Sequence, residues 1–301
     1  MPFPSARWPW RATISPRAIP ERRLNPEFVM VEIEAVIELA RAAGDAILEV
    51  YERADVGAQQ KNDSSPLTEA DLAAHHVLMA GLAKLTPEIP VLSEESVDPG
   101  WEVRANWKRY WLVDPLDGTK EFIKRNGEFT VNIALIDDSV PVLGVVSVPV
   151  RNIVYAGVLG KGAWRHDAGG RVDIRTRSMR GRGSQELPVT VVASRSHGAD
   201  TVAQWLDSIS RQVGQIETRN MGSSLKLCLV AEGSADIYPR LAPTAEWDTA
   251  AAQAVVEAAG GVVLAADLSP LRYNTKAELL NPYFFVLGDQ SYPWRELLAK
   301  G

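Results

Sequence analysis

The stretch WLVDPLDGTKEF, residues 111–122, constrains the fold more than any other part of the chain. It opens with a short apolar run that favours a β-strand, and Asp114 follows where this run ends. Pro115 and Gly118 are typical of a tight turn, because proline fixes its own backbone and glycine adopts conformations closed to other residues. The motif therefore predicts two carboxylates, Asp114 and Asp117, on a turn at a strand end.

Like charges on such a turn repel each other, and a cation bound between them relieves the repulsion. Carboxylate oxygens are hard ligands that suit Mg²⁺. A solvated surface turn is the simpler interpretation of an isolated DPxDG motif. The interpretation as a metal site therefore depends on acidic residues elsewhere in the chain.

The composition is that of a globular enzyme rather than a disordered or fibrous protein. Of the 301 residues, 46% are hydrophobic and 23% are charged, which allows one large domain or two ordinary ones. The one cysteine, Cys228, excludes an internal disulfide and fits a reducing compartment, so a cytoplasmic location is expected. No apolar run approaches the roughly 20 residues that span a bilayer and no secretory signal is visible, so stable membrane insertion is not expected.

The first 29 residues differ from the rest of the chain. They are rich in proline and carry five arginines against Glu21 and Glu27, a net charge of +3 that leaves −9 for the remainder of the −6 chain. Because the segment has no periodicity, residues 1–29 are predicted to form a flexible tail, with a targeting peptide as the alternative. The acidic remainder has no basic stripe, which disfavours nucleic acid as a partner.

From Met30 onward, hydrophobic spacing predicts two helices and then a block of strands. The helices are predicted over 31–53 and 69–85, and the second has a stripe formed by Leu72, His76, Met79 and Ala83. Strands are predicted at 89–92, 110–113, 129–136, 142–148 and 153–158. A polar stretch punctuated by glycines then predicts a domain boundary near residue 184.

Beyond that boundary, helices and strands alternate. Helices are predicted at 199–213, 223–232 and 248–259, among strands at 188–193, 215–219, 235–238, 262–265 and 284–287. The boundary defines an N-terminal α+β half, 30–184, with the metal-binding turn, and a C-terminal α/β half, 185–301, expected to bind substrate. A block of strands followed by mixed elements favours an α/β (α+β) fold of layered sheets and helices rather than a barrel.

Three further acidic blocks lie elsewhere in the chain, and each has a simple structural interpretation. Glu94 and Glu95 follow a short apolar strand and, taken alone, suit a solvated surface. Asp248 opens an alanine-rich helix, where it is chemically a good N-cap. Asp71 stands three residues after Thr68 in a capping-box pattern, so it could be only the capping carboxylate.

Taken in chain order, the four blocks resemble the Mg²⁺-dependent, lithium-sensitive phosphatases of the inositol monophosphatase superfamily. The pattern consists of an Asp at 71, an EE pair at 94–95, DPLDGT at 114–119 and WDTA at 247–250. The resemblance covers the chain from Met30 to its last residue. It implies an αβαβα sandwich of the inositol monophosphatase and fructose-1,6-bisphosphatase type, with the active site between the two halves.

A narrower resemblance is to the CysQ-type 3′(2′),5′-bisphosphate nucleotidases, a branch linked to sulfate assimilation. It is carried by the DGTKEF stretch and by residues 191–197, 222–233 and 235–240. The helix after Asp248 departs from the pattern, because the family usually has a glycine where this chain has Ala251 or Ala252. Helix packing tolerates alanine, so the departure touches no expected ligand.

The resemblance assigns a role to each matching residue. It implies that two Mg²⁺ ions are held by Glu94, Asp114, the carbonyl oxygen of Leu116, Asp117 and Asp248. It implies that Asp71 and Thr119 orient the attacking water and take its proton, and that Glu95 acts through water or at a weaker third metal. The substrate would contact Gly118, Thr119, His197, Ser223, Lys226 and Arg240. Lys226 and Arg240 would meet the distal 5′-phosphate.

The implied reaction is the hydrolysis of adenosine 3′,5′-bisphosphate to AMP and phosphate, which makes a small phosphorylated nucleotide the expected partner. Without the resemblance, Ser223 is simply a helix cap and Lys226 a solvated helix residue. An inositol or sugar phosphatase of the same fold is the alternative, although a monophosphate has no second phosphate for Lys226 and Arg240 to meet. The sequence leaves open the choice between monomer and homodimer, and the ranking of adenosine 3′,5′-bisphosphate against its phosphosulfate relative and inositol phosphates.

Other function classes fit the residues less well. An aspartyl-phosphate phosphatase needs an Asp-x-Asp turn, whereas Asp114 and Asp117 are three residues apart. A non-catalytic metal-binding protein is expected to lack some of the liganding residues, and this chain has all of them.

Overall fold

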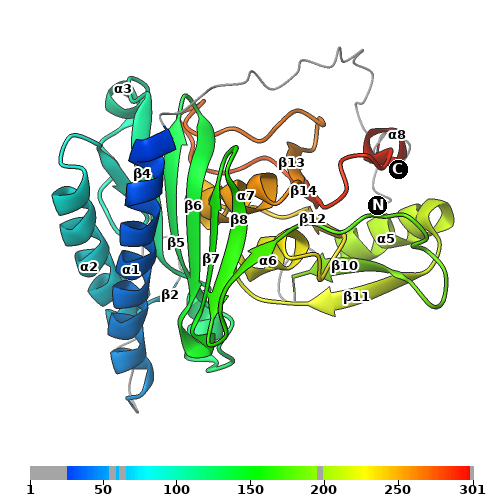
Figure 1. Ribbon diagram of the computed structural model, residues 1–301, viewed down its shortest axis with the longest axis horizontal. Coiled ribbons are helices and arrows are strands. Elements are labelled where there is room, and N and C mark those ends of the chain that lie inside the picture. The colour runs from blue at the N-terminus through cyan, green and yellow to red at the C-terminus, as the bar shows by residue number, and fades with distance from the viewer. Residues whose placement is uncertain (1–25, 54–58, 61–65, 195–198, 299–301) are drawn as a thin grey trace, which may run out of the picture.

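The computed structural model describes residues 26–53, 59–60, 66–194 and 199–298 (Figure 1). Its elements are stacked in five layers, in which helix pairs alternate with two β-sheets. From one side to the other the layers are α1 and α2, a seven-stranded sheet, α6 and α7, a five-stranded sheet, and α5 with α8. This order confirms the predicted fold class, an αβαβα sandwich. Among the described helices, none combines the length and apolar character that a membrane crossing needs.

The first layer consists of α1 (Pro26–Tyr51) and α2 (Glu69–Leu85), which pack against each other. Helix α1 begins at Pro26 rather than near Met30, and residues 1–25 lie outside the described part of the chain. The predicted spacing of α1 holds, because its sheet-facing side buries Ile33, Val36, Ile37, Ala40, Ala43, Ile47 and Val50.

The predicted buried face of α2 is wrong. The residues that α2 buries are Ala70, Asp71, Ala74, Leu78 and Leu82, whereas Leu72 is 40% exposed and His76 and Ala83 are exposed. The reason is the capping box at the helix start, which turns Asp71 inward and so fixes which side of the helix faces the protein. Alanines on that side let α2 lie close to its neighbours.

The seven-stranded sheet follows the chain order β3-β4-β5-β6-β7-β8-β9. Neighbouring strands are antiparallel, except that β3 runs parallel to β4. The bounds are β3 Val91–Ser93, β4 Arg109–Asp117, β5 Thr130–Asp137, β6 Val140–Val148, β7 Ile153–Val158, β8 Gly162–Asp167 and β9 Gly170–Ile174. The β8–β9 hairpin was not predicted, because this stretch is polar, rich in glycine and largely exposed in β9.

Short elements surround this sheet. They are β1 (Gln59–Gln60), β2 (Pro66–Leu67), α3 (Trp101–Arg104), α4 (Thr119–Ile123) and the 3₁₀ turn η1 (Pro149–Arg151). Of these, α4 matters most for function, since it follows the DPLDGT turn directly.

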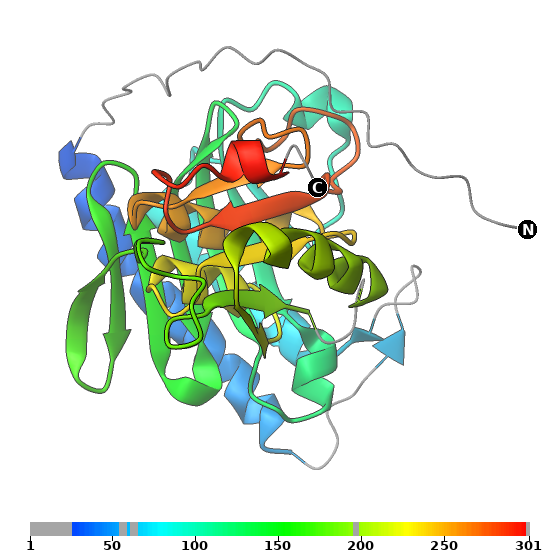
Figure 2. The ribbon, with the colours of Figure 1, turned by 90° about the vertical axis from the view of Figure 1, so that its right-hand side faces the viewer.

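The second sheet has the order β11-β10-β12-β14-β13, with β10 parallel to β11 and β12, and β14 antiparallel to β12 and β13. Its strands are β10 Val189–Ala193, β11 Ile216–Asn220, β12 Ile237–Arg240, β13 Val262–Ala265 and β14 Phe284–Leu287. Figure 2 shows α5 (Ala199–Val213) and α8 (Trp294–Leu298) on the outer face of this sheet. The inner layer holds α6 (Leu225–Ala231), the 3₁₀ turn η2 (Glu246–Asp248) and α7 (Ala250–Ala258).

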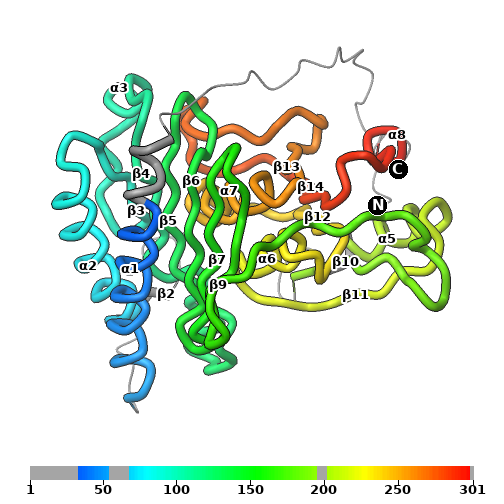
Figure 3. Tube along the Cα trace, in the orientation of Figure 1, coloured from blue at the N-terminus to red at the C-terminus, as the bar shows by residue number. Residues whose placement is uncertain are grey.

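The chain crosses from the first sheet to the second between β9 and β10 (Figure 3). The first sheet ends at Ile174 and the second begins at Val189, and we propose residue 184, between them, as the boundary between the two halves. The halves nevertheless share one hydrophobic core, in which α7 packs against strands of the first sheet while α6 packs against α7 and strands of the second sheet.

Two glycines let α7 lie directly on the first sheet. A Cβ added to Gly144 of β6 would stand 2.0 Å from the carbonyl oxygen of Ala251, and one added to Gly157 of β7 would stand 2.6 Å from Cα of Val255. Both distances are shorter than any van der Waals contact. The two glycines leave space on the sheet for side chains of α7. Ala251 is therefore accommodated on the helix, where it is buried.

We expect Gly144→Ala to lower the free energy of unfolding by roughly 1–3 kcal/mol, because the added methyl group overpacks the contact with α7. Gly169→Ala is the matched control, since its added Cβ would meet only a side-chain oxygen of Asp167 at 3.2 Å. Urea unfolding of the two variants and the wild type measures the difference. Equal midpoints for all three proteins would contradict the close approach of α7 to β6.

Candidate active site

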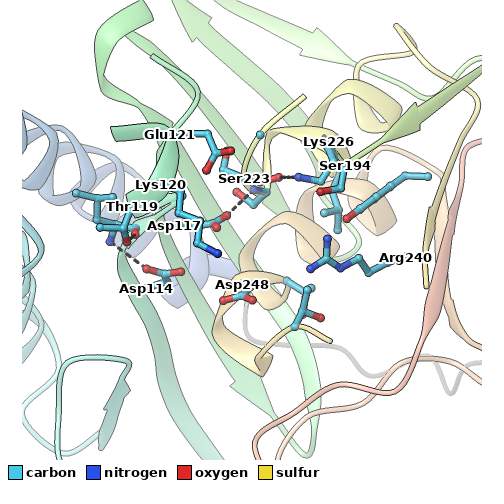
Figure 4. Close-up of a pocket in the computed structure, with 18 of the residues that line it drawn as sticks. Asp114, Asp117, Thr119, Lys120, Glu121, Ser194, Ser223, Lys226, Arg240 and Asp248 are labelled. Carbon is cyan, nitrogen blue, oxygen red and sulfur yellow. Dashed lines mark hydrogen bonds between the residues drawn. The ribbon is translucent and has the colours of Figure 1, made fainter. Parts of the chain in front are cut away.

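A cavity of about 290 Å³ lies where the end of β4 meets α6, η2 and β12 (Figure 4). It gathers residues from both halves of the chain. Most of the predicted site residues line it, namely Glu94, Asp114, Leu116, Asp117, Gly118, Thr119, Ser223, Lys226, Arg240 and Asp248. His197 lies outside the described residues, so its predicted role stays a prediction.

The DPLDGT turn places two carboxylates at this cavity through a local irregularity of β4. The pairing of β4 with β5 shifts register between Asp114 and Asp117, so both side chains face the cavity although they are three residues apart. Asp114 Oδ1 accepts a hydrogen bond of 2.9 Å from the Leu116 amide. Gly118 then adopts a φ of +94°, a left-handed conformation that glycine favours, and starts α4.

Asp248 completes a cluster of three carboxylates. One carboxylate oxygen each from Asp114, Asp117 and Asp248 lie within 4.8 Å of one another. Asp248 does not cap α7, as the simple interpretation proposed, because Thr249 is the N-cap of that helix. Instead its Oδ2 accepts a 2.9 Å hydrogen bond from the Ala245 amide across the turn η2.

Within the described part of the chain, one oxygen of each aspartate in the cluster accepts a hydrogen bond from a backbone amide. The hydrogen bonds use Oδ1 of Asp114, Oδ2 of Asp248 and Oδ2 of Asp117, and the last of these accepts from the Ser224 amide. The side chains of Thr130 and Asn132 also approach Oδ2 of Asp117, at 3.4 and 3.5 Å. The second oxygen of each carboxylate is therefore available to a ligand in the cavity.

The electrostatics of the cluster favour a bound cation. Loss of solvation raises the pKa of Asp114 well above its ordinary value, and repulsion from Glu94 and Asp117 raises it further. Loss of solvation and repulsion from Asp117 do the same to the pKa of Asp248. Loss of solvation also raises the pKa of Asp117, although the positive charge of Lys226 opposes the shift. A divalent cation among these oxygens would offset the repulsion and stabilise the ionised carboxylates, which are the hard ligands that Mg²⁺ prefers, so the residues fit Mg²⁺.

Asp71 serves both the helix and the site. Its Oδ2 accepts hydrogen bonds from the Thr68 amide at 2.8 Å and from the Thr68 hydroxyl at 2.6 Å, which completes the capping box of α2. Its Oδ1 lies 3.4 Å from the hydroxyl oxygen of Thr119, which also lies 3.5 Å from the carbonyl oxygen of Leu116. The capping interpretation is therefore correct, and Asp71 also contacts Thr119 at the site.

The EE pair reaches the site through the parallel pairing of β3 and β4. The Glu94 amide donates to the carbonyl oxygen of Val113, which brings the ends of the two strands together, and Glu94 lines the cavity. Glu95 is half-buried and is not among the residues that line the cavity. Its predicted role, through water or at a third metal, stays a prediction.

The opposite side of the cavity carries two buried cations, Lys226 and Arg240 (Figure 4). Lys226 is only 6% exposed, so its interpretation as a solvated helix residue is wrong. Its Nζ donates to the carbonyl oxygen of Ser223 and lies 5.5 Å from the ring centroid of Tyr238. Burial lowers the pKa of Lys226 to about 8.

Arg240 is fixed by the backbone that follows β12. It is 8% exposed, and its Nε and Nη2 donate to the carbonyl oxygens of Ala242 and Pro243 at 3.1 and 2.7 Å. The guanidinium group is thus held in place without a carboxylate partner among these bonds. It keeps its charge for a ligand in the cavity.

The start of α6 already binds an anion of the protein itself. Amides at a helix start favour an anion, and here the Ser224 amide donates to Asp117. The Ser224 hydroxyl lies 2.9 Å from that of Thr130 and donates to Asn132 Oδ1 at 2.8 Å. Ser223, at a φ of +43°, lines the cavity instead.

Sequence reasoning missed a row of polar residues that leads into β5, which begins at Thr130. Glu128, Thr130 and Asn132 alternate with buried apolar residues and are themselves buried, and all three lie beside the site. The signal was present in the sequence GEFTVNI, where every second residue is polar in a strand that is otherwise apolar. Such a pattern indicates that one face of the strand meets a polar site rather than the core.

Comparisons with known proteins agree with this geometry. The sequence model described as "Inositol monophosphatase family" matches residues 30–294. The 3′(2′),5′-bisphosphate nucleotidase CysQ of Escherichia coli K12 is 53% identical over 84% of this chain and 98% of its own length. The corresponding protein of Haemophilus influenzae is 36% identical over 88% of this chain and 96% of its own length.

Solved structures of proteins from the same family superpose on this chain. The crystal structure of CysQ from Bacteroides thetaiotaomicron superposes with a TM-score of 0.76 at 42% identity, over 86% of this chain and 98% of that one. An inositol monophosphatase from Anabaena superposes with a TM-score of 0.69 at 25% identity, over 90% and 95% of the two chains. The chain therefore belongs to the inositol monophosphatase family.

Proposed function

We propose that this protein is a magnesium-dependent phosphatase that hydrolyses adenosine 3′,5′-bisphosphate to AMP and phosphate. The observation that carries the proposal is the pair of buried cations, Lys226 and Arg240, across the cavity from the carboxylate cluster. A substrate with two phosphates has one for each side, whereas a monophosphate leaves the two cations unused. The similarity to proteins named 3′(2′),5′-bisphosphate nucleotidase supports the same substrate.

In this proposal Glu94, Asp114, the carbonyl oxygen of Leu116, Asp117 and Asp248 hold two Mg²⁺ ions. Bound Mg²⁺ withdraws charge from the reacting phosphate and from the attacking water. Glu95 would act through water or at a third ion. The single, buried Cys228 agrees with a reducing compartment, and we propose that the protein works in the cytoplasm.

The chain's own groups would handle the water and the proton. The Thr119 hydroxyl orients the water, and Oδ1 of Asp71 receives the proton through the contact between the two side chains. Asp71 is well placed for this task because two hydrogen bonds from Thr68 fix its other oxygen. The amides of Gly118 and Thr119 would face the reacting phosphate, while Ser223, Lys226 and Arg240 would contact the distal phosphate; His197, outside the described residues, is proposed to join them.

Removing one carboxylate of the cluster should have opposite effects on stability and on activity. We expect Asp114→Asn to raise the melting temperature in a chelator, because it relieves repulsion among buried charges, and to reduce the further gain that wild type shows with MgCl₂. It should lower kcat on the order of a hundredfold, as the loss of a strong transition-state contact does. Thermal melts and phosphate release measure both effects, with Asp137→Asn, outside the cavity, as the control. Full wild-type activity in excess chelator would refute the metal dependence.

Arg240 should matter for the second phosphate and little for the first. We expect Arg240→Ala to raise KM for adenosine 3′,5′-bisphosphate about ten- to a hundredfold, the range for a lost charge-assisted contact, with a smaller change in kcat. Adenosine 3′-monophosphate, which lacks the distal phosphate, should be affected much less. Arg109→Ala removes a half-exposed arginine outside the cavity and serves as the control. Equal losses on both substrates would make Arg240 structural.

The low pKa of Lys226 predicts a pH dependence. Above its pKa of about 8 the amine loses its proton, and with it the attraction for a phosphate dianion. We expect kcat/KM for the bisphosphate, relative to adenosine 3′-monophosphate, to fall between about pH 7 and pH 9, because kcat/KM reports titration of the free enzyme. A ratio that stays constant over this range would remove Lys226 from the distal site.

A comparison of substrates decides between the proposal and its alternative. Phosphate release with Mg²⁺ is measured on adenosine 3′,5′-bisphosphate, inositol 1-phosphate and fructose 1,6-bisphosphate. The bisphosphorylated nucleotide should give the highest kcat/KM. A preference for inositol 1-phosphate would assign the protein to the inositol phosphatases of the same fold.

A further inference from the structure

The turn Gly222–Ser224 belongs to the second half of the chain but is hydrogen-bonded to the first half through two backbone amides and through the Ser224 hydroxyl, which contacts Thr130 and Asn132. The Ser224 amide donates to Asp117 in the carboxylate cluster. The Gly222 amide donates to Oε2 of Glu128 at 2.8 Å. Glu128 is 7% exposed and is not among the residues that line the cavity, and its bond to the Gly222 amide connects it to the Gly222–Ser224 turn.

The turn is also confined by close packing. A Cβ added to Gly222 would stand 2.7 Å from Cγ of Glu121 and 2.9 Å from the carbonyl oxygen of Glu128. Ser223 has a φ of +43°, which is uncommon for a residue with a side chain. The turn can keep this conformation only while its neighbours hold it in place.

What the turn holds is the distal side of the cavity. The Ser223 carbonyl oxygen accepts the hydrogen bond from Nζ of Lys226, and Ser223 itself lines the cavity. A displacement of the turn away from Glu128 therefore moves both Ser223 and the ammonium group of Lys226. The carboxylate cluster has further supports, because Asp114 and Asp248 are fixed by amides of Leu116 and Ala245.

We propose that Glu128 is a positioning residue for the distal phosphate: its carboxylate accepts the Gly222 amide and thereby places Ser223 and Lys226. The inference rests on the proposed function, since it concerns the distal phosphate of that substrate. It goes beyond the proposed function because Glu128 neither contacts the substrate nor belongs to the metal-binding set. Thr130 and Asn132 lie beside Asp117 and contact the Ser224 hydroxyl, whereas Glu128, just before β5, accepts the Gly222 amide.

The test compares Glu128→Ala with Glu128→Gln. Alanine leaves the buried Gly222 amide without its acceptor, whereas the side-chain oxygen of glutamine can still accept that hydrogen bond. Asp289→Ala is the matched control, because Asp289 also accepts a backbone amide, that of Met179 at 2.8 Å, but lies away from the cavity. Each protein is assayed on adenosine 3′,5′-bisphosphate and adenosine 3′-monophosphate, and binding of AMP, which keeps the 5′-phosphate, is measured by titration calorimetry.

We expect Glu128→Ala to raise KM for the bisphosphate and Kd for AMP about tenfold, the effect of one lost hydrogen bond to a charged group. The change in KM for adenosine 3′-monophosphate should be several times smaller. Glu128→Gln should restore most of the affinity for AMP, and Asp289→Ala should leave KM and Kd close to their wild-type values. Gly222→Ala, which keeps Glu128 but pushes the turn away, should reproduce the pattern of Glu128→Ala.

Three results would overturn the inference. One is an unchanged Kd for AMP in both Glu128→Ala and Gly222→Ala. Another is an equal loss on the two substrates, which would make Glu128 a general support of the fold. The third is a Gln variant as weak as the Ala variant. A wild-type enzyme that does not prefer the bisphosphate over adenosine 3′-monophosphate would instead defeat the proposed function, so the two failures are distinguishable.

Discussion

Repulsion among Asp114, Asp117 and Asp248 is the constraint on which the rest of the site depends. Three carboxylate oxygens within 4.8 Å, in a partly enclosed cavity, oppose folding unless something else fixes them. In this protein one oxygen of each carboxylate accepts a hydrogen bond from a backbone amide, and the other oxygen remains available to a ligand in the cavity. Asp248 and the Ser224 amide that binds Asp117 both come from the second half, so the cluster forms only when both halves of the chain are assembled.

Local chemistry explains what the sequence predicted well. A turn such as DPLDGT is determined by its own proline and glycine, so the position of Asp114 and Asp117 at a strand end followed from those residues. The helix α1 and most strands followed from apolar spacing that long-range packing does not alter. The order of the four acidic blocks then indicated the family, which the match over residues 30–294 confirms.

Long-range packing explains what the sequence did not predict. The buried face of α2 includes Asp71, which forms the capping box and also reaches Thr119 at the site, and so the apolar residues of that helix indicated the wrong side. Lys226 is buried because α6 lies between two sheets, a fact that no local pattern contains. Glu128 acts on a turn that is 94 residues away in the sequence, so its role depends on the tertiary structure.

One hydrogen bond connects the two ends of the substrate site. Asp117 is a member of the carboxylate cluster and also accepts the hydrogen bond from the amide of Ser224, the N-cap of α6. Helix α6 carries Lys226. A cation bound at the carboxylate cluster therefore alters the electrostatic attraction between Asp117 and the start of α6. A movement of the start of α6 in turn alters the electrostatic potential at the cluster. Thermodynamic linkage requires the effect to be reciprocal. By whatever factor a bound cation increases the affinity for the distal phosphate, the bound phosphate increases the affinity for the cation.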